Sequence, residues 1–245
     1  MAIRILVNGA FGRMGQMAAK MISEQKRFEL VGQTGREYNL KNAIIDSKAD
    51  VVVDFTTAEA VFTNTTAIIE ANARPVIGTS GLHHDQVAQL QALCAQKKLG
   101  GIIVPNFSIG AVLMMKFAKE AAKYMPHCEI IEMHHAGKAD SPSGTAIRTA
   151  EMMKESNPDI NRDKKSSHEV IKGARGADYK NIPIHAVRLP GFLAHQQILF
   201  GGLGETLTFR HDSIDRQCFM PGVALACEKV MQLDKLVYGL EEILS

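Results

Sequence analysis

The sequence predicts an α/β protein in which a Rossmann-like, doubly wound parallel sheet is joined to a second, mixed α/β domain. Two observations predict the sheet. Short apolar runs without polar alternation recur through residues 1–105, and segments with helical spacing separate them, which is typical of a parallel sheet covered on both faces. A glycine-rich turn at residues 9–15 directly follows the first apolar run. Beyond residue 106 the pattern changes, which predicts the second domain.

The elements of the first part follow from the order of these apolar runs. Strands are predicted at residues 3–7, 30–31, 51–55, 75–77 and 102–104. Helices are predicted from the glycine turn to residue 22, at 59–71 and at 85–97. Strands that alternate with helices in this way are joined by right-handed crossovers, which build an open, doubly wound sheet.

Beyond residue 106 the spacing of apolar and polar residues is different. We expect helices at residues 112–124 and 145–155, a strand at 129–134, and antiparallel strands at 186–189, 196–200 and 205–210. Residues 157–178 are polar and rich in Lys, Ser and Gly, which predicts a mobile loop. A helix at 221–231 is expected to pack back on the first part. The predicted domains are therefore residues 1–105 with 215–245, and residues 106–214.

Composition excludes several classes of protein. The 245 residues are 46% hydrophobic and 22% charged with a formal net charge of +2, as in ordinary globular proteins. The densest basic group, Arg162, Lys164 and Lys165, is short and mixed with Asp163, so a solvated loop is predicted and no nucleic-acid partner. No apolar run approaches the ~20 residues of a membrane span, and we expect a cytoplasmic protein with no membrane partner. The four cysteines form no CxxC pair, so neither a metal site nor a disulfide is predicted.

The glycine turn predicts a dinucleotide-binding site. Gly9, Gly12 and Gly15 lie between the first strand and the first helix. Glycines at such a turn let the backbone bend tightly, let a pyrophosphate approach the helix start, and let the helix pack close to the strand. Ala10 stands where the middle glycine of the usual GxGxxG is found, and a purely structural turn is the alternative. Arg36 favours the 2′-phosphate of NADPH, although the adjacent Glu37 leaves NADH open and Arg36 is alternatively an ordinary surface residue.

Two further loops lie at the carboxyl ends of predicted strands, where doubly wound folds bind ligands. Residues 78–81 read Gly-Thr-Ser-Gly, and residues 105–108 read Pro-Asn-Phe-Ser. Their small and hydroxyl side chains are suited to contact a nicotinamide and its carboxamide. The alternative is a pair of ordinary loops in which Ser80 or Ser108 caps a helix.

A dense group of ionisable and turn-forming residues follows the strand at 129–134. His134, His135 and Lys138 precede a Ser-Gly-Thr helix start at residues 143–145. Imidazole exchanges protons near neutral pH, and an ammonium group and helix-start amides bind anions. The segment predicts a site for a small acidic substrate whose reaction needs a proton. Because the side chains of neighbouring strand residues point to opposite faces, only one of the two histidines is expected in the site. The alternative is that both histidines face the core, hydrogen-bonded to backbone groups, and have no catalytic role.

Taken together, four segments resemble the dihydrodipicolinate reductase family, also called 4-hydroxy-tetrahydrodipicolinate reductases. They are GAFGRMG at residues 9–15, VDFT at 53–56, VIGTSG at 76–81 and EIIEMHHAGKADSPSGTA at 129–146. The last is very specific to the family, and matches run in order from residue 3 to about 225. The sequence departs from the family pattern in two places. The acidic residue after the second strand has no clear match, and Ser80 stands where a second threonine is common.

The resemblance implies an NAD(P)H-dependent oxidoreductase that reduces 4-hydroxy-2,3,4,5-tetrahydrodipicolinate to tetrahydrodipicolinate, in the diaminopimelate route of lysine biosynthesis. It places the proton donor on His134, an assisting donor and carboxylate ligand on Lys138, and a further carboxylate contact on His135. Other substrate contacts fall on Ser143, Gly144 and Thr145. Cofactor contacts fall on Gly9, Ala10, Phe11, Gly12, Arg13, Met14, Arg36, Gly78, Thr79, Ser80, Pro105, Asn106, Phe107 and Ser108.

The resemblance also implies how the domains divide the work. The first domain is expected to bind NADPH or NADH, and the second to bind a small cyclic dicarboxylate and to form a homotetramer.

Two rival interpretations of the function remain. One is another two-domain oxidoreductase, such as an amino-acid or aldehyde dehydrogenase. A semialdehyde enzyme would need a nucleophilic cysteine, and no cysteine here lies at a helix start. A nucleotide-sensing regulator would bind the cofactor without turnover and would leave the group around His134 unexplained.

Overall fold

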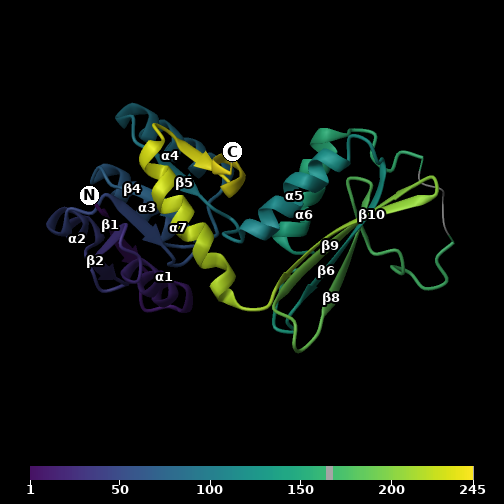
Figure 1. Ribbon diagram of the computed structural model, residues 1–245, viewed down its shortest axis with the longest axis horizontal. Coiled ribbons are helices and arrows are strands. Elements are labelled where there is room, and N and C mark those ends of the chain that lie inside the picture. The colour runs from purple at the N-terminus through teal and green to yellow at the C-terminus, as the bar shows by residue number, and fades with distance from the viewer. Residues whose placement is uncertain (164–167, 245) are drawn as a thin grey trace. The chain divides into compact units, whose positions relative to one another are not determined.

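The computed structural model describes residues 1–163 and 168–244, which form two compact units (Figure 1). The first unit contains Met1–Ile109 and Arg216–Ser245, and the second contains Gly110–Asp215. The predicted fold class is confirmed, because the first unit has a parallel sheet covered by helices and the second has a mixed sheet. Among the described residues, no helix combines the length and apolar character needed to cross a membrane.

Sheet A of the first unit has six strands in the order β11-β5-β4-β3-β1-β2, and every neighbouring pair is parallel. The strands are β1 (Ile3–Asn8), β2 (Phe28–Thr34), β3 (Val51–Asp54), β4 (Arg74–Ile77), β5 (Gly101–Ile103) and β11 (Leu236–Tyr238). Strand β11 was not predicted, and β2 is longer than predicted because the polar Glu29 and Gln33 interrupt its apolar run.

Helices cover both faces of sheet A. On one face α1 (Arg13–Ser23) contacts α7 (Met220–Lys229), so the predicted return of the C-terminal helix to the first part is confirmed. On the other face α2 (Leu40–Ser47), α3 (Val61–Glu70) and α4 (His84–Lys97) contact one another in series. Short 3₁₀ turns lie at Arg216–Phe219, Val230–Gln232 and Leu240–Ile243.

The order of the strands creates a topological switch point. Strand β1 lies between β2 and β3, so the chain crosses first to one side of β1 and later to the other. Open α/β sheets bind ligands outside the carboxyl ends of the strands at such a point. In this sheet the carboxyl ends at the switch point belong to Asn8 of β1 and Asp54 of β3.

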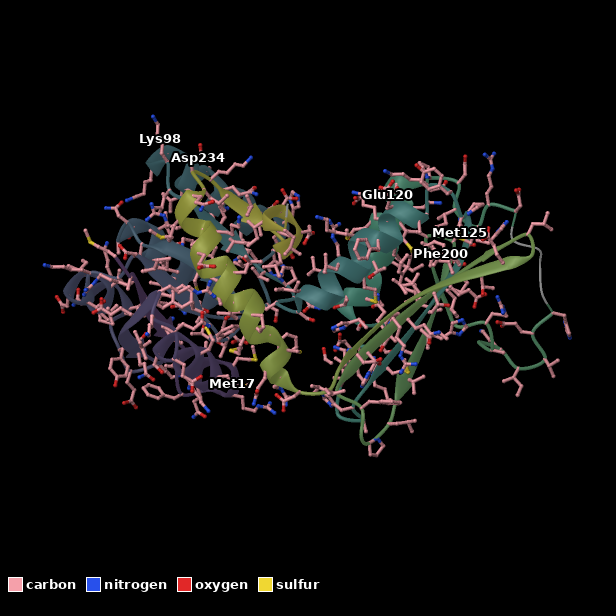
Figure 2. All side chains as sticks on the ribbon, viewed as in Figure 1. Met17, Lys98, Glu120, Met125, Phe200 and Asp234 are labelled. Atoms are coloured by element: carbon pink, nitrogen blue, oxygen red, sulfur yellow. The ribbon has the colours of Figure 1, made fainter. Side chains whose placement is uncertain are left out.

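The second unit is built on sheet B, whose strands run in the order β10-β9-β6-β8-β7. Its strands are β6 (His127–His134), β7 (Ala177–Tyr179), β8 (Ile182–Arg188), β9 (Ala194–Gly202) and β10 (Glu205–Ser213), and its helices are α5 (Ile109–Ala121) and α6 (Gly144–Ser156). Both helices lie along one face of the sheet (Figure 1). Phe200 of β9, labelled in Figure 2, is fully buried and packs edge-on against Phe209 of β10.

Three expectations for the second unit need correction. Strand β8 is parallel to its neighbour β6, not antiparallel, because the long connection between them includes α6 and lets the chain cross back to the start of the sheet. Strand β7 begins inside the segment that was predicted to be a loop, and α5 begins three residues before the predicted start. Lys164 and Lys165 of the predicted basic loop lie outside the described residues.

Candidate active site

The end of β6 carries a paired carboxylate and imidazole. Glu132 and His134 are two residues apart on the strand, so their side chains point to the same face. Glu132 is 0% exposed, and its Oε2 lies 2.6 Å from Nδ1 of His134. An ionised carboxylate can only accept hydrogen bonds, so Nδ1 carries the hydrogen. The ring is therefore held through Nδ1, which leaves Nε2 for exchange with a substrate.

Arg188 of β8 forms a fork on the same carboxylate. The register of the parallel pair places Arg188 beside His134. Its Nη1 donates to Oε2 of Glu132 at 2.7 Å and its Nη2 donates to Oε1 at 2.8 Å. Nη2 also donates to the carbonyl of Asp140 at 2.8 Å. This two-pronged geometry is the strong form of an arginine–carboxylate pair, and it binds the loop after β6 to the sheet.

The start of α6 is attached to the same group. The backbone N–H of Ser143 donates to Oε1 of Glu132 at 3.1 Å. The Ser143 hydroxyl accepts from the N–H of Ala146 at 3.2 Å and caps the helix. A Cβ added at Gly144 would meet no heavy atom within 4 Å, so there is open space beside the first turn. Helix starts of this kind attract anions.

The Glu132 carboxyl is ionised at neutral pH despite its burial. Burial alone raises its pKa, but hydrogen bonds from His134 and Arg188 and the charges of both groups outweigh burial and hold the pKa at about 2. The negative charge therefore persists inside the unit, next to one ring nitrogen of His134.

The remaining predicted substrate residues lie in the loop after β6. His135 follows the end of the strand and is exposed, and its carbonyl accepts from the N–H of Lys138 at 3.1 Å. Nζ of Lys138 donates to both carboxylate oxygens of Asp140, at 2.6 and 2.8 Å. This hydrogen bond is the main reason that the pKa of Asp140 is lowered. A substrate carboxylate would compete with Asp140 for Lys138.

Two other histidines of sheet B also pair with carboxylates. Nε2 of His185 lies 2.8 Å from Glu129, and Nδ1 of His195 lies 2.7 Å from Asp212. These acids are partly exposed, with side chains 31% and 38% accessible, whereas the Glu132 side chain is 0% accessible. Among the three pairs, complete burial and attachment to a helix start distinguish the pair that contains His134.

In the first unit, two glycines of the nucleotide turn are required by close backbone contacts. Gly9 has a φ of +77°, and a Cβ there would lie 2.3 Å from the carbonyl oxygen of Phe55. A Cβ on Gly15 would lie 2.1 Å from the carbonyl oxygen of Gly9. Gly12 is different, since a Cβ there would meet only that oxygen at 3.4 Å. Gly12 thus leaves room before α1, which has no side-chain cap, so the N–H groups of this helix start are the ones that could hold a phosphate group.

The predicted cofactor residues around this turn range from the buried Ala10 to an exposed rim. The N–H groups of Gly9 and Ala10 both donate to the carbonyl of Thr34, which ties the turn to the end of β2. Phe11 is exposed, and its ring stacks on Tyr38 with centroids 6.2 Å apart. The remaining members of this group are the exposed Arg13 and Arg36 and the half-buried Met14.

A buried acid joins the loops at the switch point. Asp54 is 0% exposed, and its carboxylate accepts from Nδ2 of Asn8 at 2.8 Å and from the hydroxyls of Thr56 and Thr79 at 2.7 and 2.6 Å. The Thr79 hydroxyl also accepts from the N–H of Thr56. The Thr79 side chain therefore holds the loop in place, and the exposed Ser80 is the hydroxyl of this loop that faces solvent.

The loop at 105–108 has both exposed and core residues. Phe107 is buried and packs edge-on against Phe55, with centroids 5.6 Å apart. A Cβ on Gly78 would lie 2.2 Å from the Phe55 ring, so glycine is required there. Ser108 is buried, and its N–H donates to Oδ1 of Asn106 at 2.9 Å, while Pro105 is exposed. The described residues contain no cluster of three His, Cys, Asp or Glu side chains that could hold a metal.

No role was predicted for Glu132, Arg188 or Asp54. A signal existed for Glu132, because it lies two residues before His134 on a predicted strand. A signal also existed for Asp54, as an acid that ends a wholly apolar strand. No local signal marks Arg188, which lies 56 residues from Glu132.

Known proteins resemble this chain along its whole length. Two family profiles match, "Dihydrodipicolinate reductase, N-terminus" over residues 3–107 and "Dihydrodipicolinate reductase, C-terminus" over residues 110–244. The 4-hydroxy-tetrahydrodipicolinate reductases of Coxiella burnetii (strain Dugway 5J108-111) and Legionella pneumophila (strain Lens) are 54% and 51% identical over 244 residues, with 100% of each chain covered. The dipicolinate-bound dihydrodipicolinate reductase from Paenisporosarcina sp. TG-14 superposes with a TM-score of 0.90 at 46% identity, with both chains fully covered. This chain belongs to the dihydrodipicolinate reductase family.

Proposed function

We propose that the protein reduces 4-hydroxy-tetrahydrodipicolinate to tetrahydrodipicolinate with NAD(P)H as the reductant. The observation that carries the proposal is His134, held through Nδ1 by buried Glu132, which also holds the anion-attracting start of α6. Two of the relatives named above are reductases of this substrate, and the Paenisporosarcina relative is bound to dipicolinate, a cyclic dicarboxylate.

The substrate is a cyclic imine with two carboxylates, and the loop after β6 carries groups suited to each. The amides of Gly144 and Thr145 at the start of α6 bind one carboxylate, with Ser143 as the helix cap. Lys138 and His135 neutralise charge nearby, with Lys138 exchanging its bond to Asp140 for one to the substrate.

The hydroxyl of the substrate leaves as water together with a hydrogen from the neighbouring ring carbon, and reduction of the resulting conjugated ring then needs one hydride and one proton. The reduced nicotinamide supplies the hydride when it is bound. Negative charge then develops on the ring nitrogen, and His134 donates its Nε2 proton to that atom while Nδ1 keeps its hydrogen bond to Glu132. General acid catalysis of this kind contributes about 10²–10⁴-fold to the rate. Lys138 assists as a second donor.

The cofactor is proposed to bind along the switch point of sheet A. The N-terminal turn of α1, opened by Gly12, receives the pyrophosphate, and the loops at 78–80 and 105–108 lie along the nicotinamide half. Arg36 follows the end of β2 and is exposed, so its guanidinium is available to a 2′-phosphate. On this basis we propose that NADPH binds more tightly than NADH.

Cysteine chemistry of the semialdehyde dehydrogenase type is disfavoured by the thiols themselves. Burial raises the pKa of Cys94 to about 11 and the pKa of Cys128 to about 12, and it also raises the pKa of Cys227. A thiol reacts as its thiolate, so these three groups are poor nucleophiles near neutral pH.

A homotetramer is also proposed, through the face of sheet B opposite α5 and α6. Strand pleating points Ile131, Met133 and Leu199 to that face, where they are half-buried in the single chain. The same face carries the ion pairs of Glu129 and Asp212, and a sheet face that mixes apolar and charged side chains in this way suits association with a second copy.

Steady-state kinetics tests the proposed reaction. Purified protein should oxidise NADPH or NADH only when 4-hydroxy-tetrahydrodipicolinate is present, with one tetrahydrodipicolinate formed per cofactor consumed. Folded protein that turns over neither cofactor would refute the proposal. Tight cofactor binding without turnover would instead favour the nucleotide-sensing regulator.

A further inference from the structure

We infer that Glu132 is a positioning residue that holds the proton donor His134 and the anion-binding start of α6 in one geometry. The inference rests on the proposed function for the roles of those two elements. It adds a role for a side chain that does not itself contact the substrate, because Glu132 is fully buried beneath both elements.

The two oxygens of Glu132 divide their contacts between the two parts of the site. Oε2 accepts from Nδ1 of His134, and Oε1 accepts from the N–H of Ser143. Each oxygen also accepts one N–H of Arg188. Four donors therefore surround one carboxylate, which leaves it little freedom to rotate. A movement of this group would displace the imidazole and the helix start together.

The contact with Oε2 also decides which nitrogen can give up a proton. Because the carboxylate holds the hydrogen on Nδ1, the proton that His134 transfers must come from Nε2. After transfer the neutral ring keeps its hydrogen on Nδ1 and presents a bare Nε2, ready to be protonated again. A carboxylate fixes the tautomer and orientation of a catalytic histidine in the same way in the Ser-His-Asp triad.

Arg188 allows this carboxylate to remain ionised while buried. An isolated charge inside a protein neutralises itself, whereas a forked arginine compensates the charge and occupies one acceptor position on each oxygen. Arg188 in addition holds the carbonyl of Asp140, in the loop that carries Lys138. The pair thus supports the loop as well as the two ends of the site.

The same strand offers a matched control. Glu129 also binds one histidine and one arginine, His185 and Arg175, but its side chain points to the opposite face of sheet B. The substitutions Glu132→Gln and Glu129→Gln therefore each remove one carboxylate charge from a histidine and an arginine, although Glu129 is 31% accessible and Glu132 is buried. Only the first replaces one of the two oxygens that accept from His134 and Ser143.

The decisive kinetic comparison uses Glu132→Gln, Glu129→Gln and the unmodified protein, each shown to be folded by circular dichroism. Glu132→Gln should lower kcat by at least about 10-fold, toward the roughly 10⁴-fold loss that follows when the orienting carboxylate of a Ser-His-Asp triad becomes an amide. It should also weaken binding of dipicolinate, while KM for NADPH stays within about twofold. Glu129→Gln should leave all three quantities unchanged. Wild-type kcat in folded Glu132→Gln, or an equal loss in both variants, would overturn the inference.

Two further measurements keep the inference testable if Glu132→Gln does not fold. Glu132→Asp keeps the charge opposite Arg188, but its side chain is one methylene shorter and cannot reach both His134 and Ser143. This variant should therefore also have a lower kcat. A wild-type kcat in Glu132→Asp would count against the inference. In the unmodified protein, ¹⁵N NMR of the neutral His134 ring, assigned with His134→Gln, should show hydrogen on Nδ1. Hydrogen on Nε2 would overturn the inference whether or not the protein turns over the proposed substrate.

Discussion

At the scale of single residues, Glu132 shows how an ionised group can be kept inside a folded unit. Removing a carboxylate from water costs several kcal/mol even after relaxation. Here a forked arginine, an imidazole N–H and a backbone N–H take the place of water. Removing one partner of such a pair costs about 3–5 kcal/mol, because the other charge remains buried and uncompensated.

The pKa of about 2 makes the contribution of Glu132 to stability pH-dependent. A carboxyl whose pKa is lower in the folded state than its ordinary value near 4.5 stabilises the fold above that value, and the contribution is lost as pH falls toward 2. The free energy of unfolding, measured by urea titration, should therefore fall between these pH values. Glu132→Gln should show a shallower fall, and parallel curves for the two proteins would contradict this prediction.

His134→Gln should lower kcat strongly and KM for the substrate little, because Gln keeps a polar side chain but has no titratable proton to transfer. Loss of a general acid predicts a fall of about 10²–10⁴-fold. Steady-state kinetics at saturating NADPH measures the effect. A kcat within about threefold of the wild-type value would show that His134 is not the proton donor.

Arg36 decides the proposed preference for NADPH. Arg36→Ala removes the cation expected to face the 2′-phosphate, so KM for NADPH should rise about tenfold or more while KM for NADH changes little. Arg27→Ala is a control, since Arg27 pairs with Glu228 on the surface of the same unit. Equal changes in KM for both cofactors would refute the role assigned to Arg36.

At the scale of elements, the turn between β1 and α1 separates glycines required by the fold from one that leaves space. Gly15→Ala should destabilise the protein by about 1–3 kcal/mol, because its Cβ would collide with the Gly9 carbonyl.

Gly12→Ala should lower the free energy of unfolding by less than about 1 kcal/mol but weaken NADPH binding, since its methyl group fills the space before α1. Thermal unfolding and fluorescence titration measure the two effects, and unchanged binding in Gly12→Ala would argue against a pyrophosphate there.

Elements that a local pattern marks clearly were predicted, and elements defined by their neighbours were not. The apolar runs within β3 and β4 and the helix start at Ser143 follow from the sequence. Helix α2 was missed because its sequence, LKNAIIDS, spans only eight residues, too few to show a helical repeat of apolar positions. The parallel pairing of β8 was missed because strand order depends on contacts between distant segments.

At the scale of the whole molecule, the proposed assembly can be tested through the open face of sheet B. Light scattering after gel filtration should give four times the mass of one chain. Leu199→Glu should reduce this mass, because burying an unpaired charge in an apolar contact is costly. Ile45→Glu, on the exposed surface of α2 in the other unit, should leave the mass unchanged. A tetramer that tolerates Leu199→Glu would exclude this face as the interface.

By itself the sequence determined the fold class, the family and the contiguous group from His134 to Thr145. Periodic apolar runs and closely spaced motifs are local properties that can be read along the chain. Only the tertiary structure decided what holds that group in place. Strand pairing brings Arg188 beside His134 and folds the start of α6 onto Glu132, and such contacts between distant residues leave no periodic trace in the chain.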